Sequence, residues 1–290
     1  MKKLFAKFKR ASQFWRLKLA NVVSRRSVIS PGGAVVSLTT HGIRLEQVYL
    51  TIESIARGAV RPSRLILWRN PGSDDSYLPK TLARLQRRGL EIQFSENFGP
   101  HTKYFPYVAS VAAHEIPLVT ADDDVIYPPH WLCDLVVAHT AEPQHIHCYR
   151  ARRVQISGIA LKSYEDWPFA DSKEPSSLNF ATGVSGVVYP PALLDALRKA
   201  GPAFMACCPK ADDVWLHAMA LRHGYRIKQL SACYRDFPVA PMTQGLALYI
   251  NNARPEGNDK QISATYTLSD IEELVQENSL VGPAKPWEPA

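Results

Sequence analysis

Three adjacent carboxylates, Asp122, Asp123 and Asp124, follow a short apolar run in the segment LVTADDDVIYPP. Neighbouring carboxylates raise one another's pKa unless a cation relieves their repulsion. Mg²⁺ and Mn²⁺ prefer oxygen ligands, and they often bind one or two carboxylates together with substrate phosphates. In an extended chain, Asp122 and Asp124 point to one side and Asp123 to the other. We therefore predict that Asp122 and Asp124 hold Mn²⁺ or Mg²⁺ beside a diphosphate; the alternative is an exposed acidic turn.

A second acidic pair, Asp212 and Asp213, precedes the segment VWLHAMAL. Carboxylates at the start of a helix satisfy free backbone amides and interact favourably with the helix dipole, which explains one aspartate better than two. The alternative is a general base, which needs to lie within hydrogen-bond reach of a substrate hydroxyl. The residues alone leave both interpretations open.

The acidic segments need a framework that brings them together, and the hydrophobic pattern predicts one. Strand patterns at 34–40, 65–68, 90–94 and 117–120 alternate with helical patterns at 45–57, 79–88 and 104–114. Such alternation predicts a mostly parallel sheet with helices on both faces. Ligands bind beyond the carboxyl ends of the strands in such sheets, and the acidic triplet directly follows the fourth strand.

The alternation weakens after about residue 145. We predict strands at 145–150 and 186–189, a polar loop at 165–177 and a helix over 212–223. The 290 residues, 46% of them hydrophobic, suit one large domain or two small ones and exclude a disordered chain. The five cysteines include no C-x-x-C pair, which argues against a zinc site or a disulfide framework.

The net charge of +7 is concentrated at the N-terminus. Residues 1–30 hold nine lysines and arginines and no acid, so residues 31–290 carry a net charge of −2. On a helix, one apolar stripe would contain Leu4, Phe8, Ala11, Trp15, Leu19 and Val22, with Phe14 and Leu17 outside it. A basic amphipathic helix of this kind is typical of the membrane interface. We predict that residues 1–26 bind an anionic membrane; the alternatives are a flexible tail or a helix packed on its own domain.

Other classes of partner and location are less consistent with the sequence. The mildly acidic domain shows no nucleic-acid motif, so we expect no nucleic acid as a partner. We find no run of about 18 apolar residues and no secretory signal. The expected location is therefore the cytoplasm, at the inner face of the membrane.

Taken in order, the motifs resemble those of GT-A-type glycosyltransferases, close to the family 2-like bacterial polysaccharide enzymes. The resemblance covers residues 34–262 and lies in these segments: VSLTT at 36–40 with Arg44, Leu67-Trp68, Thr102-Lys103-Tyr104, Asp122–Asp124 with Tyr127-Pro128, TGVSG at 182–186 with Tyr189-Pro190-Pro191, Asp212–Trp215 and NDKQ at 258–261. A Q-x-x-R-W motif, which many family 2 enzymes carry and which is associated with processive synthesis, does not occur. Transfer of a single sugar is therefore favoured over chain synthesis.

The resemblance implies a GT-A (Rossmann-like) fold and an inverting, metal-dependent transfer from a nucleoside-diphosphate sugar to a cell-surface glycan or lipid-linked acceptor. It implies donor contacts by Thr39, Thr40, Arg44, Trp68, Lys103, Asp122, Asp123 and Asp124. Asp213 or Asp212 would deprotonate the acceptor, and Thr182 and Gly183 would line its pocket. Trp167, in a polar loop, is our candidate for stacking on a sugar. The expected domains are an arm at 1–30, a catalytic domain at 31–270 and a tail at 271–290.

Two other functions compete with this interpretation. A nucleotidyltransferase acting on a sugar or polyol phosphate also uses an α/β sheet and carboxylates. It would usually show a glycine-rich basic loop after the first strand, and TTHGIR at 39–44 fits that pattern poorly. The other alternative is a non-catalytic, membrane-bound glycan-binding protein, against which the intact carboxylates count.

Overall fold

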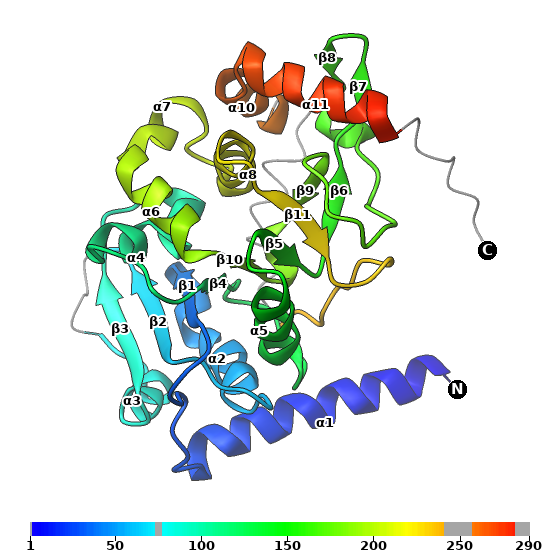
Figure 1. Cartoon of the computed structure of the whole chain (residues 1–290). Coiled ribbons are helices and arrows are strands. Elements are labelled where there is room, and N and C mark those ends of the chain that lie inside the picture. Colours follow the sequence, from blue (N-terminus) through cyan, green and yellow to red (C-terminus); the bar gives the residue numbers. More distant parts are fainter. Residues whose placement is uncertain (1, 73–76, 241–256, 282–290) are drawn as a thin grey trace.

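A seven-stranded sheet of order β11-β5-β10-β4-β1-β2-β3 forms the centre of the molecule. The computed structural model describes residues 2–72, 77–240 and 257–281 (Figure 1). β10 runs antiparallel to β4 and β5, and the other neighbours pair in parallel. The strands are β1 Val35–Thr40, β2 Arg64–Arg69, β3 Leu90–Phe94, β4 Leu118–Thr120, β5 His145–Cys148, β10 Val187–Tyr189 and β11 Arg226–Gln229. The expected α/β fold with a mostly parallel central sheet is confirmed.

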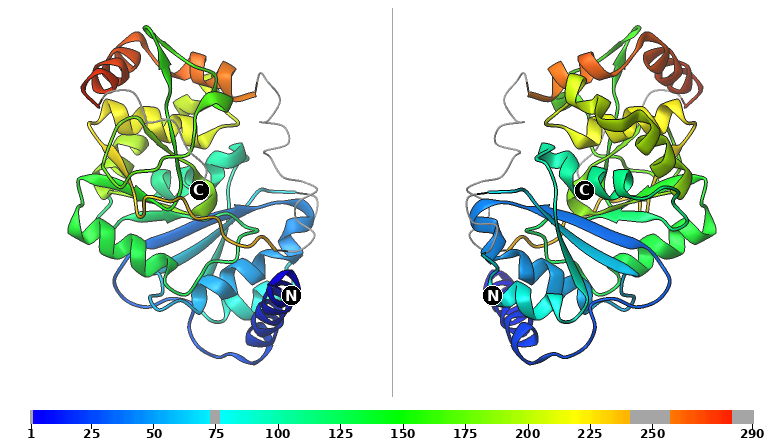
Figure 2. Two further views of the ribbon diagram at one scale, coloured as in Figure 1. Left: turned by 90° about the vertical axis from the view of Figure 1, so that its right-hand side faces the viewer. Right: turned by 90° about the vertical axis from the view of Figure 1, so that its left-hand side faces the viewer.

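Helices cover both faces of this sheet, as Figure 2 shows. Alternate side chains of β1 point to opposite faces, so Val35 belongs to one hydrophobic core and Val36 to the other. One face packs against α2 Val48–Ala56, α3 Lys80–Gln86 and α5 Trp131–Ala141. The other packs against α4 Phe105–Ser110, α6 Pro191–Ala200, α7 Phe204–Cys207 and α8 Asp212–Arg222.

Several short strands and turns outside the sheet were not predicted by the hydrophobic pattern. Two short antiparallel pairs join β6 Ala151–Arg153 to β9 Asn179–Ala181 and β7 Ile156–Ser157 to β8 Ala160–Leu161. The 3-10 turns are η1 Gly42–Glu46, η2 Gly99–Lys103, η3 Tyr164–Asp166, η4 Gly183–Ser185 and η5 Gly201–Ala203. The helix expected over 104–114 is shorter, because the chain becomes extended at Val111. These short elements form the loops around the site.

The N-terminal helix α1 extends over Lys2–Val23 and packs on its own domain through one side. Leu17, Ala20 and Asn21 are buried against α2 and α3. Residues of the predicted stripe face outward instead: the exposed fractions are 70% for Trp15 and 60% for Leu19. Leu4 and Phe8 lie outside the residues whose side chains the structure describes. In the described part of the chain, no helix combines the length and the apolar character needed to cross a membrane.

A buried ion pair fixes α1 to the domain. The Glu53 carboxylate on α2 is fully buried, and Arg88 Nη2 donates to its Oε2 at 3.2 Å. Asn21 Nδ2 on α1 donates to Glu53 Oε1 at 3.1 Å, and Arg88 Nε donates to the Arg26 carbonyl at 2.7 Å. Each charge is thus paired and hydrogen-bonded, as a buried charge requires.

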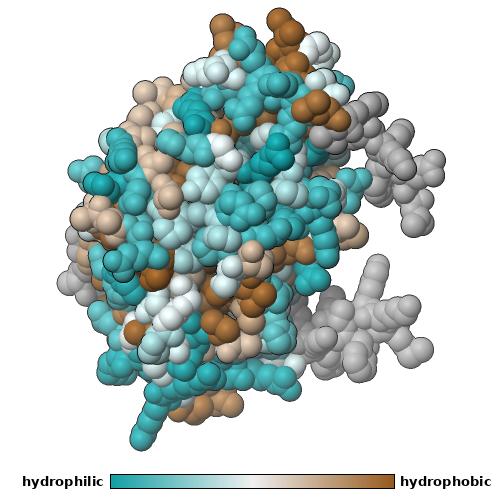
Figure 3. All heavy atoms as spheres, in the orientation of Figure 1, coloured by the Kyte–Doolittle hydropathy of each residue, from teal (hydrophilic) through white to brown (hydrophobic). Residues whose placement is uncertain are grey.

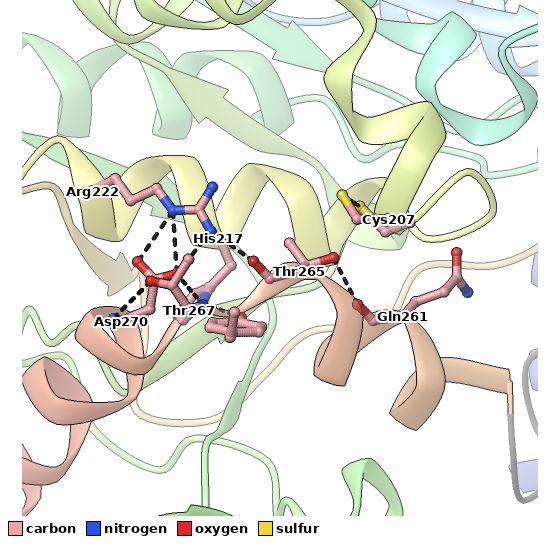
Figure 4. A network of polar contacts seen from close by, with 9 residues as sticks. Cys207, His217, Arg222, Gln261, Thr265, Thr267 and Asp270 are labelled. Carbon is pink, nitrogen blue, oxygen red and sulfur yellow. Dashed lines mark hydrogen bonds and ion pairs between the residues drawn. The ribbon is translucent and has the colours of Figure 1, made fainter.

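Two C-terminal helices, α10 Gly257–Thr265 and α11 Leu268–Val281, pack on α8. Figure 4 shows the polar contacts at this junction. Arg222 Nη2 donates to Asp270 Oδ2 at 2.7 Å and to the Thr265 carbonyl at 2.6 Å. Because Leu274 is fully buried, the folded chain continues past residue 270, where we expected the domain to end. Residues 282–290 of the expected tail lie outside the described residues.

Candidate active site

A cavity of about 880 Å³ opens at the carboxyl ends of β1 and β4. Its wall brings together segments that are far apart in the sequence. The predicted site residues that line it are Thr39, Arg44, Lys103, Asp122, Asp123, Asp124, Thr182, Gly183, Asp212 and Asp213. Both acidic groups therefore face one cavity at the edge of the sheet where ligands are expected.

The acidic triplet divides its contacts between the fold and the cavity. Asp123 accepts hydrogen bonds from Thr40 Oγ1 at 2.7 Å and from Arg44 Nη1 at 2.8 Å. Its backbone carbonyl also accepts from Thr51 Oγ1 at 3.0 Å. Asp123, with only 5% of its surface exposed, therefore serves as an anchor between β1, η1 and α2. Thr40 is itself buried and reaches the site through this bond.

Asp124 and Asp122 carry the charge that the triplet leaves facing the cavity. Burial, followed by the charges of Asp122 and Asp123, raises the pKa of Asp124 to about 6. The Arg44 guanidinium, 3.5 Å away, acts in the opposite direction but does not cancel this shift. The described residues therefore compensate the negative charge of the triplet only in part.

Lys103, at the end of η2, joins the two acidic groups. Its Nζ lies 2.9 Å from Asp122 Oδ1 and 3.3 Å from Asp212 Oδ2. Burial alone would lower the pKa of Lys103, but the charges of Asp122, Asp212 and Asp213 raise it well above its usual value. The lysine therefore stays protonated, and its one ammonium group contacts both the triplet and the Asp212–Asp213 pair.

Asp213 lies in the first turn of α8, but its side chain does not cap this helix. Its Oδ1 accepts a hydrogen bond from the Gly183 amide at 3.1 Å, in the η4 turn. Burial, followed by the charge of Asp212, raises the pKa of Asp213 to about 8, although Lys103 counteracts this shift. A Cβ on residue 183 would lie 3.2 Å from Asp213 Oδ1 and 3.5 Å from Lys103 Nζ, so glycine allows this close approach. The position gives Asp213 a contact and a pKa that helix capping does not explain.

Two predicted aromatic contacts are wrong. Trp167 is fully buried and its Nε1 donates to the Lys162 carbonyl at 3.0 Å, because the loop folds back between Tyr164 and Phe180. Trp68 lies in the hydrophobic core and its Nε1 donates to Ser37 Oγ at 2.9 Å. Neither side chain lines the cavity, whereas Tyr164 and Phe180 do.

Two arginines that the motifs did not predict lie in the cavity wall. Arg150 and Arg152, at the start of β6, both line the cavity. Their signal was the alternation in YRAR at 149–152, which overlaps the end of the strand predicted at 145–150, because alternate residues of an extended chain share a side.

α10 connects two walls of the cavity. Asp259 Oδ1 accepts from the Tyr164 amide at 2.8 Å, and its Oδ2 accepts from Ser163 Oγ at 2.6 Å. Gln261 Oε1 accepts from the Lys210 amide at 2.8 Å, just before α8. The NDKQ segment thus positions both η3 and the turn that carries Asp212 and Asp213.

The chemistry of the site suits a divalent cation only with help from a substrate. Within the described ranges, no three His, Cys, Asp or Glu side chains are grouped closely enough to hold a metal ion. Asp122 and Asp124 offer the carboxylate oxygens that Mg²⁺ and Mn²⁺ prefer, and their charge is incompletely compensated. Phosphate oxygens of a substrate would have to complete the coordination.

Comparison with known proteins gives a likeness in structure and none in sequence. No family profile matches the chain, and no curated protein sequence matches it. Residues 1–349 of TarS from S. aureus share 12% identity with a TM-score of 0.49, covering 85% of this chain and 72% of that one. The mannosyltransferase PcManGT from Pyrobaculum calidifontis, solved with GDP-Man and Mn²⁺, shares 13% identity with a TM-score of 0.46, covering 93% and 83%.

A third similar structure is a CMP:2-keto-3-deoxy-manno-octonic acid synthetase in complex with CTP. It shares 10% identity with a TM-score of 0.43 and covers 77% of this chain and 99% of that one. Similarity at these levels concerns the general fold, and activity has to be inferred from the residues of the site.

Proposed function

We propose that the protein is a metal-dependent glycosyltransferase that transfers a single sugar, with inversion, from a nucleoside-diphosphate sugar to an acceptor hydroxyl. The observation that carries this proposal is the pairing of two acidic groups across Lys103 in one cavity. The Asp122–Asp124 end has the charge and oxygen ligands suited to a cation and a diphosphate. The Asp212–Asp213 end has a carboxylate whose pKa of about 8 suits a proton acceptor near neutral pH.

Asp213 is the better candidate for the general base. Its carboxylate is fixed by the Gly183 amide, whereas Asp212 is the aspartate that pairs with Lys103. In the proposed reaction, the acceptor oxygen attacks the anomeric carbon while its proton moves to Asp213. The bond from that carbon to the diphosphate oxygen breaks, and its electron pair leaves with the nucleoside diphosphate.

Negative charge grows on the leaving diphosphate during this displacement. Lys103 and Arg44 are the cationic side chains of the wall that lie against the acidic triplet. A divalent ion held by Asp122 and Asp124, when bound, would supply further stabilisation of that charge. Asp123 and Thr40 would act indirectly, by fixing the backbone that carries the two ligands.

Hydrolysis of a donor panel tests the proposal. The full chain is incubated with nucleoside-diphosphate sugars and Mn²⁺, and released nucleoside diphosphate is measured with and without EDTA. We expect slow release from one donor class and none with EDTA. Pyrophosphate released from a nucleoside triphosphate and a sugar phosphate would instead support a nucleotidyltransferase. Binding of glycans without any turnover would support the non-catalytic alternative.

We further propose that α1 holds the protein at an anionic membrane, on the cytoplasmic side where lipid-linked acceptors would be reached. The support is the outward position of its apolar stripe: Trp15, Leu19 and Val22 are exposed although the opposite side of the helix is packed. Arg16 and Lys18 are exposed beside them. Figure 3 shows a small hydrophobic patch among hydrophilic side chains at the lower edge of the molecule, where α1 lies. Apolar side chains next to cations are suited to the interface of an anionic bilayer.

A further inference from the structure

The cavity has a basic wall that the proposed reaction does not use. Arg150 and Arg152 extend from the start of β6 into the cavity wall, next to Tyr164. They are separated from each other by Ala151 alone. A pair of guanidinium groups in a substrate cavity is suited to phosphate or carboxylate, because each guanidinium offers a planar set of donors.

Aromatic rings hold both arginines in place. The Arg152 guanidinium lies 4.7 Å from the Tyr164 ring centre and 5.1 Å from that of Phe169. The Arg150 guanidinium lies 4.8 Å from the Phe169 ring centre, and Phe169 stacks on Tyr234 at 4.0 Å. Arg152 Nη1 also donates to the Trp167 carbonyl at 2.7 Å. The two side chains are therefore oriented before any ligand binds.

The charge of this wall is only partly neutralised. Arg150 pairs with Asp236 at 2.8 Å, and that aspartate side chain is 55% exposed. Among the residues that the structure describes, Arg152 has no carboxylate within ion-pair distance. In the part of the chain that the structure describes, the buried Nε atoms of both arginines find no hydrogen-bond partner. A guanidinium that lines a cavity without a full set of counter-charges favours an anionic ligand.

The position of the wall assigns it to the acceptor rather than the donor. The Arg150 carbonyl accepts a hydrogen bond from the Thr182 amide at 3.0 Å. Thr182 precedes Gly183, whose amide binds Asp213. The arginines thus lie at the end of the cavity that holds the proposed base, whereas the acidic triplet contacts Arg44 and Lys103.

We propose that Arg150 and Arg152 bind an anionic group of the acceptor, so that the acceptor is a glycan or lipid-linked sugar carrying a phosphate or carboxylate near the reacting hydroxyl. This inference rests on the proposed glycosyl transfer, which assigns the Asp213 end of the cavity to the acceptor. Orientation of the acceptor by its charge would bring the hydroxyl toward Asp213.

Binding of small probes to the full chain tests the inference without requiring turnover. Calorimetry is carried out with glucose 6-phosphate, glucuronate and neutral methyl glucoside, in the presence of Mn²⁺ and a nucleoside diphosphate that occupies the donor end. We expect at least one charged probe to bind about tenfold or more tightly than methyl glucoside, because hydrogen bonds to charged groups are worth that much. Preference for the phosphate or the carboxylate probe identifies the anionic group.

Variants with a matched control separate binding from folding. Arg152→Gln should remove the preference for charged probes over methyl glucoside, and Arg152→Lys should keep part of that preference. Arg153→Gln is the control, because Arg153 Nη1 donates to Ser176 Oγ and Asn179 Oδ1 and does not line the cavity. Melting temperatures of all variants establish that they are folded.

Two outcomes would overturn the inference: equal affinity for charged and neutral probes, or an unchanged preference in Arg152→Gln. Displacement of the charged probe by the nucleoside diphosphate would also overturn it, because the anion would then occupy the donor position. Donor hydrolysis is measured on the same preparations. Hydrolysis without anion preference refutes only this inference, whereas absence of hydrolysis with every donor counts against the proposed function.

Discussion

Two buried charge clusters of this protein contrast with each other. At the α1–α2–α3 junction, one carboxylate, Glu53, meets one guanidinium, Arg88, and Asn21 and the Arg26 carbonyl provide further hydrogen bonds. In the cavity, one ammonium group, Lys103, faces the carboxylates of Asp122 and Asp212 directly. The first cluster is balanced, and the second contains more acid than base.

The difference distinguishes a structural cluster from a candidate catalytic one. A balanced, fully hydrogen-bonded pair stabilises one arrangement of the chain and has nothing left to offer a ligand. Surplus carboxylates raise the pKa of Asp213 to about 8 and that of Asp124 to about 6, after burial has already shifted both upward. Such shifts are frequent where a protein binds cations or moves protons.

The sharpest test of the contrast removes the proposed base. Asp213→Asn should lower the rate of donor hydrolysis about 10²–10⁴-fold, the usual contribution of general base catalysis, while donor binding is retained. The measurement is nucleoside-diphosphate release under saturating donor and Mn²⁺. Asp212→Asn serves as the comparison, and a larger loss in that variant would reverse the assignment of the base.

A substitution in the balanced Glu53–Arg88 cluster should change the stability of the protein and leave its activity unchanged. Glu53→Gln leaves Arg88 buried without a counter-charge, which should lower the free energy of unfolding by about 3–5 kcal/mol. Urea unfolding measures the loss, and donor hydrolysis per folded molecule should be unchanged. The double variant Glu53→Gln/Arg88→Met should recover part of the stability; an undiminished stability in Glu53→Gln would show that the pair is not structurally important.

The pH dependence of stability offers a third comparison. Because the pKa of Asp213 is raised from 3.8 to about 8 in the folded chain, its stabilising contribution is complete below about pH 4 and is lost as the pH rises through about 8. Asp213→Asn carries no titrating group there. The melting temperature of the variant in EDTA should therefore rise relative to the native chain between pH 5 and pH 9. A constant difference over that range would contradict the raised pKa.

The smallest expected effect concerns α1. Because Leu17, Ala20 and Asn21 pack on the domain, deletion of the helix would disturb the fold, and substitutions on its outer side give a cleaner test. Trp15→Glu should reduce sedimentation with phosphatidylserine-containing vesicles by about tenfold, in keeping with the loss of one large apolar contact. Ile159→Glu, at an exposed position far from α1 in the sequence, is the control. Equal sedimentation of both variants and the native chain would exclude this role of the helix.

The sheet and its acidic edge could be predicted from the sequence because both depend on local patterns. Alternating strand and helix signals gave the first four strands, and the triplet directly follows β4. The pattern also predicted the helix α1, but it did not predict which side of the helix packs on the domain. That side buries Leu17 and Ala20 together with Asn21, whose Nδ2 donates to Glu53 Oε1, a polar contact that hydrophobic periodicity does not reveal.

Other features of the site depend on tertiary contacts between distant segments. A tryptophan in a polar loop looked available to a sugar, yet Trp167 packs between Tyr164 and Phe180. The direction of Arg152 follows from β6 pairing with β9, and the contacts of Lys103 follow from η2 meeting α8. The spacing of residues along the chain does not predict such contacts between distant segments.

Binding of a nucleoside diphosphate in the presence and absence of Mn²⁺ tests most directly whether the two ends of the cavity have separate roles. Calorimetry compares the native chain with Asp122→Asn, Asp124→Asn and Asp213→Asn. We predict that the first two variants lose the Mn²⁺-dependent part of the affinity and that Asp213→Asn retains it. Equal Mn²⁺ dependence in all four proteins, or none in the native chain, would contradict the assignment of the acidic triplet to the donor.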